Sequence, residues 1–126
     1  MRNLDELSYK VIGCAIEVHR TLGPGLLESV YEKALLHELT LNNIPVRSQV
    51  AVKANYKGLD VGEGLRLDLL VDEQLIVELK SVDDFKPVHH KQLLTYLKLI
   101  NKQLGLLINF NVCNLTDGVK RIVNNY

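Results

Sequence analysis

The stretch "LRLDLLVDEQLIVELKS", residues 65–81, contains two apolar runs separated by the three polar residues "DEQ" at 72–74. Two short apolar runs joined by such a segment predict an antiparallel hairpin with a three-residue loop. Paired positions in an antiparallel hairpin sum to a constant, so Asp68 is expected directly opposite Glu78. Glu78 and Lys80 interrupt a strand whose other side chains are apolar. Packing alone does not require charged residues at these positions.

The two faces of this hairpin are expected to differ. One face is wholly apolar and should belong to the core: Leu65, Leu67, Leu69, Val71, Leu75, Val77 and Leu79. The other face carries a mixture: Arg66, Asp68, Leu70, Ile76, Glu78 and Lys80. Because Leu70 and Ile76 are apolar, we expect a helix to cover this second face, with the charged residues at the edge of a cleft.

Two helices are expected before the hairpin. Apolar residues recur every three or four positions from Leu4 to Leu22, which predicts an amphipathic helix with one buried stripe. After the helix-breaking "LGPG" at 22–25, a second helix is expected from about Gly25 to Asn42, with Pro24 near its start. Next, "VRSQVAVKANYKG" at 46–58 alternates like a one-sided strand.

The remaining segments complete a mixed domain. "HHKQLLTYLKLINK" at 89–102 predicts a third helix, and "QLGLLINFNV" at 103–112 is typical of a strand buried on both faces. "GVKRIVNNY" at 118–126 is expected to add a short edge strand. The order helix, helix, strand, strand, strand, helix, strand predicts one α/β domain over residues 1–126, with a central mixed sheet of four to five strands flanked by helices.

Composition limits the classes of function. Fifteen basic and fifteen acidic residues cancel among the 126, so no overall positive field draws the chain to nucleic acid or to an anionic membrane. Cys14 and Cys113 are far apart, which indicates neither a disulfide framework nor a zinc site. The first residues lack the apolar segment of a signal peptide, and no apolar run approaches membrane-spanning length. A cytoplasmic protein without membrane contact is expected.

Asp68 and Glu78 have two alternative explanations. Facing carboxylates repel each other, and a shared divalent cation would resolve the conflict. Mg²⁺ or Mn²⁺ prefers oxygen ligands, which the two acids and a backbone carbonyl such as that of Leu79 supply, while Lys80 could position a nucleophile. This arrangement suits phosphodiester hydrolysis. The alternative, which is commoner among amphipathic hairpins, is a solvated sheet face on which Lys80 and Arg66 pair with the acids.

Asp68 together with "ELK" at 78–80 resembles the core motif of the PD-(D/E)XK nuclease superfamily. Gln92 and Tyr96 in "QLLTY" are similar to the QxxxY motif of its RecB-like branch, and "GLLESVY" at 25–31 resembles the signature of the small GxxExxY family. The resemblance extends from the first helix to "GLLINF" at 105–110. The superfamily's usual proline is absent, because Leu67 precedes the aspartate.

The resemblance implies a nuclease-like core and assigns roles to individual residues. Asp68 and Glu78 would be metal ligands, Lys80 the catalytic lysine, and Glu28 a helical acid that supports or joins the metal site. Gln92 and Tyr96 would line the cleft. Glu28 has a second explanation, because an acid in the first turn of a helix is favoured by the helix dipole. Tyr96 is also expected to pack on Leu70 and Ile76.

Other polar residues are assigned outside the catalytic set. His89 and His90 precede the third helix and could cap it, bind phosphate or act as a base, whereas His19 is expected to be structural or solvated. Candidates for nucleic-acid contact are scattered through the chain: Lys53, Lys57, Arg66, Lys86, Lys91 and Lys98.

The sequence thus predicts a Mg²⁺- or Mn²⁺-dependent nuclease whose partner is nucleic acid, DNA in preference to RNA. A chain this short would gain gripping surface as a homodimer. The alternative is a non-catalytic nucleic-acid-binding or protein-assembly module that retains the nuclease fold.

Overall fold

The computed structural model describes residues 3–126, and the predicted order of the main elements is confirmed. The helices are α1 (Leu4–Leu22), α2 (Glu28–Leu41), α3 (Pro87–Leu99) and the short 3₁₀ helix η1 (Leu115–Gly118). The strands are β1 (Val46–Ala51), β2 (Asn55–Tyr56), β3 (Leu59–Asp60), β4 (Arg66–Val71), β5 (Leu75–Lys80), β6 (Leu104–Asn109) and β7 (Val119–Val123).

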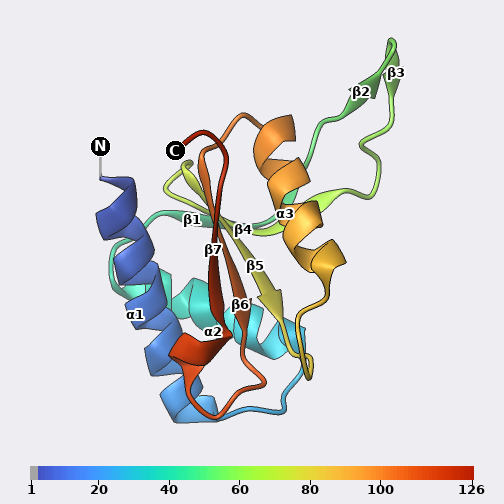
Figure 1. Cartoon of the computed structure of the whole chain (residues 1–126). Coiled ribbons are helices and arrows are strands. Elements are labelled where there is room, and N and C mark those ends of the chain that lie inside the picture. The colour runs from blue at the N-terminus through green and yellow to red at the C-terminus, as the bar shows by residue number, and fades with distance from the viewer. Residues whose placement is uncertain (1–2) are drawn as a thin grey trace.

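A mixed five-stranded sheet forms the centre, in the order β1-β4-β5-β6-β7. Strands β5 and β6 are parallel, and the other neighbours are antiparallel. The parallel pair needs a crossover connection, which α3 supplies. α1 and α2 lie on one side of the sheet and α3 on the other (Figure 1). The predicted α/β fold is therefore confirmed, and β7 is the expected edge strand.

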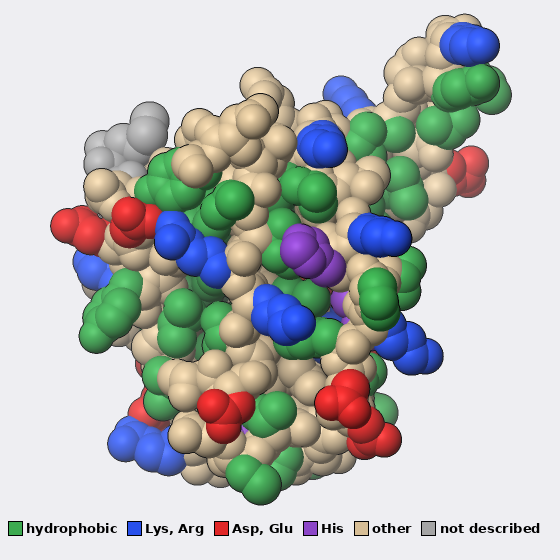
Figure 2. Space-filling model, viewed as in Figure 1, with side chains coloured by type: hydrophobic (Ala, Val, Ile, Leu, Met, Phe, Trp, Pro, Cys, Tyr) green, Lys and Arg blue, Asp and Glu red, His purple; other side chains and the backbone are tan. Residues whose placement is uncertain are grey.

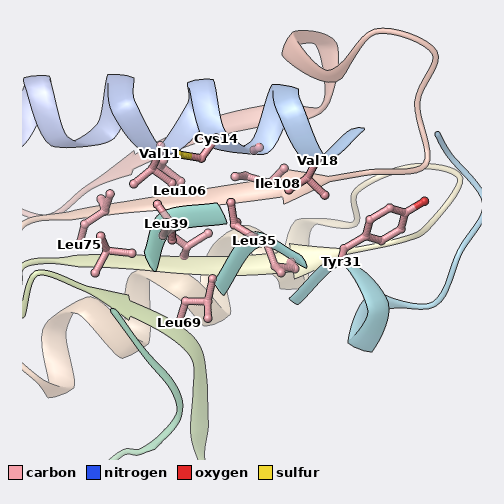
Figure 3. Packing of buried hydrophobic residues seen from close by; sticks show 14 of the residues in the cluster. Val11, Cys14, Val18, Tyr31, Leu35, Leu39, Leu69, Leu75, Leu106 and Ile108 are labelled. Atoms are coloured by element: carbon pink, nitrogen blue, oxygen red, sulfur yellow. The ribbon is translucent and has the colours of Figure 1, made fainter. Parts of the chain in front are cut away.

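The sheet separates two hydrophobic cores. The first core lies between the sheet and the helices α1 and α2, where Val11, Leu35 and Leu106 pack together (Figure 3). The second core lies under α3 and includes Ile76, Leu93 and further apolar residues of β4 and β6. Because β5 and β6 contribute side chains to both cores, their residues are almost all apolar, as is typical of buried strands.

The β4–β5 hairpin has the predicted register but not the predicted faces. Leu69 pairs with Val77 and Val71 with Leu75, and the same register places Asp68 opposite Glu78. Leu69 lies in the first core as expected. The assignment of Leu65 and Leu67 to that core is wrong, because both pack in the second core under α3.

A local change of backbone explains this switch of faces. Gln49 of β1 has a φ of 51°, in the left-handed region that residues other than glycine seldom adopt. Val46 on one side of it packs against the first core, whereas Val50 on the other side packs against the second. Both strands of the β1–β4 pair therefore turn over at this point, and an alternation rule based on a regular strand fails.

Element bounds and the burial of one helical residue also differ from expectation. α2 begins at Glu28 rather than Gly25, because Gly25 has a φ of 91° and belongs to the preceding turn with Pro24. The segment expected as one strand over residues 46–58 forms β1 only as far as Ala51. Leu22, the expected last member of the α1 stripe, is 39% exposed.

The residues between β1 and β4 form an arm, defined as residues 53–64, that projects from the body beside α3 (Figure 1). Strands β2 and β3 pair as a separate two-stranded sheet closed by Lys57 and Gly58, both with positive φ, as a tight hairpin turn requires. Tyr56 and Leu59 are exposed on it. The face that includes α3 and the arm carries Lys and Arg side chains spread over its surface rather than in one patch (Figure 2).

Candidate active site

Asp68 and Glu78 meet where the β4–β5 hairpin opens. The regular pairing of the two strands runs from the loop to Leu69 and Val77, after which carboxylates bind the opposite backbone. The Asp68 N–H donates to Glu78 Oε2 at 2.8 Å, and the Leu79 N–H donates to Asp68 Oδ2 at 2.8 Å. Each acid thus crosses to the other strand, and the two carboxylates lie together as predicted.

Glu78 lies in an environment that disfavours its charge. The residue is only 8% exposed. Burial, and then the charge of Asp68, raise the pKa of Glu78 to about 8, against the opposing effects of the Asp68 N–H and of Lys80. Within the described chain, two acids therefore share a partly closed site in which a cation would be stabilised.

Lys80 ends β5 two residues beyond Glu78, and the chain after it is clamped to β6. The buried amide of Asn109 accepts from the Val82 N–H at 3.1 Å and donates to the Val82 carbonyl at 2.8 Å. The Phe110 N–H donates to the Lys80 carbonyl at 2.9 Å. Lys80 is half-buried, and its charge acts on Glu78. Asn109 was not predicted; its only signal is an amide that ends an apolar strand.

α3 brings Tyr96, Gln92 and His89 to the same face. Tyr96 is buried in the second core with Leu70 and Ile76, as its packing role predicts. Burial, and then the charges of Glu78 and Asp68, raise its pKa. Gln92 Nε2 donates to the Tyr96 hydroxyl at 3.4 Å.

Two of the histidines, His89 and His19, make structural contacts. His89 lies inside α3 rather than before it, and its Nδ1 accepts from the N–H of the N-cap residue Lys86 at 3.1 Å, so it takes part in capping the helix. Burial, and then the cations Lys80 and Lys86, lower its pKa. His19 is buried, with Nε2 2.7 Å from the Val112 carbonyl oxygen, so its expected structural role is confirmed.

Glu28 is exposed at the start of α2, directly after a loop that Tyr31 holds in place. The Tyr31 hydroxyl donates to the Gly23 carbonyl at 2.6 Å and accepts from the Leu26 N–H at 3.1 Å. Its ring is fully buried and stacks on Phe110 with centroids 4.4 Å apart; Figure 3 shows the hydroxyl pointing toward this loop. Glu28 borders a surface hollow of about 360 Å³ that extends to Ser81, directly after Lys80.

Sequence reasoning missed a third acid near Asp68. Glu32, one turn after Glu28 on α2, accepts from Gln49 Nε2 at 2.7 Å. Burial raises the pKa of Glu32, the Gln49 bond lowers it, and the charges of Asp68 and Glu28 raise it. No sequence signal separates Glu32 from an ordinary helical acid, because its neighbours come from β1 and β4.

The donor set at Asp68 and Glu78 fits a hard divalent cation. One oxygen of each carboxylate accepts a backbone N–H, which leaves the second for another interaction. Mg²⁺ commonly takes one or two protein carboxylates and keeps several waters. Across residues 3–126, no group of three or more His, Cys, Asp or Glu residues is placed to hold a metal ion. The structure thus brings Asp68 and Glu78 together. Glu28 does not form a three-acid cluster with them.

Comparison with known proteins identifies one family. A family model described as the PD-(D/E)XK nuclease superfamily matches residues 5–122. No curated protein and no solved structure matches the chain significantly. In the part of the chain that the structure describes, no helix has both the length and the apolar character needed to cross a membrane.

Proposed function

Because the chain belongs to the PD-(D/E)XK nuclease superfamily, we propose that it is a metal-dependent nuclease that hydrolyses phosphodiester bonds in DNA. The observation that carries the proposal is the pair of carboxylates, Asp68 and Glu78, each bonded to a backbone N–H across the open end of the hairpin, with Lys80 two residues after Glu78 on β5. Within the superfamily, the "QLLTY" and "GLLESVY" segments favour the RecB-like branch and the GxxExxY group, in a single domain.

Asp68 and Glu78 would hold Mg²⁺ or Mn²⁺, with the Leu79 carbonyl and Glu28 as further candidate ligands. When bound, such an ion polarises a phosphoryl oxygen and lowers the pKa of a bound water. Lys80 would orient the attacking water and offset the negative charge that develops on phosphate. Gln92 and Tyr96 would close the α3 side of the cleft and restrict access of bulk water.

Nucleic acid would approach over the face formed by α3 and the arm, where basic side chains are spread (Figure 2). The zero net charge of the whole chain means that affinity must come from this local surface or from a second subunit. A homodimer would double the contact area and is part of the proposal.

A specific observation also favours a non-catalytic alternative. Asp68 and Glu78 both accept backbone N–H groups at 2.8 Å, so they could serve only to join β4 to β5 in a nucleic-acid-binding or assembly module. Divalent-cation binding that is lost in Asp68→Asn would favour the nuclease, because the amide keeps an acceptor oxygen but loses the charge.

The proposal is tested by cleavage of labelled linear duplex, circular duplex, single-stranded DNA and RNA in Mg²⁺ or Mn²⁺. The wild type is expected to cut DNA, and both Lys80→Ala and a chelator are expected to abolish cutting, with a loss of at least about 10²-fold from removal of the charge-stabilising group. Lys10→Ala removes an exposed lysine of α1, on the other side of the sheet from α3, and serves as the control. Equal cutting by wild type and Lys80→Ala would contradict the proposal.

A further inference from the structure

We propose that Gln49 is a positioning residue of the candidate active site, holding the carboxylate of Glu32 beside Asp68 so that a third negative charge strengthens binding of a divalent cation. This inference rests on the proposed metal-dependent function and adds two residues that no sequence motif indicates.

The register of the sheet places Gln49 next to the site. β1 pairs with β4 through Ser48 and Leu69 on one side of Gln49, and through Val50 and Leu67 on the other. Gln49 therefore lies across from Asp68, at the one step where the regular pairing of these strands is interrupted. This is also the point at which both strands switch between the two cores.

The backbone of Gln49 is strained at this position. A φ of 51° brings the Cβ atom of a residue other than glycine too close to the following carbonyl oxygen. Glycine would adopt the same conformation without this strain. Such strain persists where the surroundings fix it, and it is concentrated at functional sites. The glutamine side chain is therefore expected to make a contact that glycine could not make.

The side chain of Gln49 provides the contact to α2. Its Nε2 donates to Glu32 Oε1 at 2.7 Å, while its own backbone carbonyl accepts from Arg66 Nη1 at 3.3 Å. The Arg66 side chain thus bonds the Gln49 carbonyl at the point where the regular strand pairing is interrupted. Gln49 and Glu32 join β1 to α2 beside Asp68, from elements that are distant in sequence.

The effect of Glu32 would be electrostatic rather than direct ligation. Its charge lies within reach of Asp68, yet among the described residues no three acids are grouped closely enough to bind one ion together. A carboxylate in this position raises the local attraction for a cation and can accept from a cation-bound water. Loss of such an outer partner costs about 10–100-fold in affinity at metal sites.

The test is the dissociation constant of Mn²⁺ for the full chain without nucleic acid, measured by electron paramagnetic resonance, together with the melting temperature. Gln49→Gly is expected to weaken Mn²⁺ binding about tenfold while the melting temperature stays the same or rises, because glycine relieves the strained φ. Glu32→Gln is expected to weaken binding equally, and the double variant no further.

Asn101→Gly is the matched control. Asn101 is an exposed amide with a φ of 56° at the end of α3, outside the site. This variant should bind Mn²⁺ like the wild type.

Wild-type Mn²⁺ affinity in Gln49→Gly would overturn the inference, as would a weakened affinity that is accompanied by a lower melting temperature. If wild type binds Mn²⁺ and Gln49→Gly binds it weakly but no nucleic acid is cut, the inference stands and the nuclease proposal fails. If wild type cuts and Gln49→Gly retains full affinity, only the inference fails. A wild type that binds no Mn²⁺ would overturn both.

Discussion

At Glu78, the proposed chemistry requires a charged carboxylate, and that charge destabilises the folded protein. A carboxylate that is 8% exposed and opposite a second acid is costly to ionise in a low-dielectric setting. Two backbone N–H groups partly compensate the pair. Because a bound divalent cation would compensate the charges more fully, the unliganded protein should reveal the cost through its response to pH.

The pH dependence of stability follows from the direction of this shift. In the folded chain, burial and Asp68 raise the pKa of Glu78 from 4.5 to about 8, so the folded state binds the proton more tightly than the unfolded state. The free energy of unfolding therefore falls as pH rises from 4.5 to about 8. We expect the metal-free melting temperature to drop by roughly 5–10 °C, and Glu78→Gln to remove most of the drop.

Thermal melts monitored by circular dichroism across this pH range measure the effect. Glu63→Gln, which alters an exposed acid on the arm, is the control and should behave like the wild type. If Glu78→Gln kept the wild-type dependence, another group would be responsible and the proposed conflict at Glu78 would be refuted.

At the scale of elements, the sequence predicts those features of the fold that depend on residues close together in the chain. The "DEQ" loop and the two apolar runs determine the β4–β5 register, so the pairing of Asp68 with Glu78 follows from the sequence alone. The change of face at Gln49 could not be predicted, because glutamine has no marked preference for positive φ and neighbouring residues give no signal. Leu65 and Leu67 were assigned to the wrong core for this reason.

The arm is the element whose contribution can be removed cleanly. Ala54 and Val61 already form a backbone bond at 2.8 Å across its base, so residues 55–60 can be replaced by Asn-Gly, a favoured two-residue turn. Because Tyr56 and Leu59 are exposed, the free energy of unfolding should change by less than about 1 kcal/mol. We expect affinity for duplex DNA to fall roughly three- to tenfold through loss of Lys57 and Tyr56.

Fluorescence anisotropy with a labelled duplex, in the Lys80→Ala background to prevent cutting, measures this affinity. Mn²⁺ affinity is the internal control and should not change. Undiminished DNA affinity in the shortened variant would show that nucleic acid does not reach the arm.

At the scale of the whole molecule, the site depends on contacts between distant segments. Tyr31 fixes the loop before Glu28, Asn109 fixes the chain after Lys80, and Gln49 links β1 to Glu32. Sequence motifs could identify the acids and the lysine of the hairpin, because their spacing is local. They could not identify Glu32, Gln49 or Asn109, whose roles arise only when α2, β1 and β6 pack around the hairpin.

The central claim is that Asp68 and Glu78 act as one catalytic centre, and its most direct test is the rate of DNA cleavage in Mn²⁺ for Asp68→Asn, Glu78→Gln and the double variant. Both substitutions keep an oxygen that can accept the backbone N–H, so the hairpin should remain joined. Each single variant is expected to lose at least about 10³-fold in rate and the double variant no more, since residues that act as a unit are not additive. Single variants that cut within about tenfold of wild type would contradict the account, as would losses that simply multiply in the double variant.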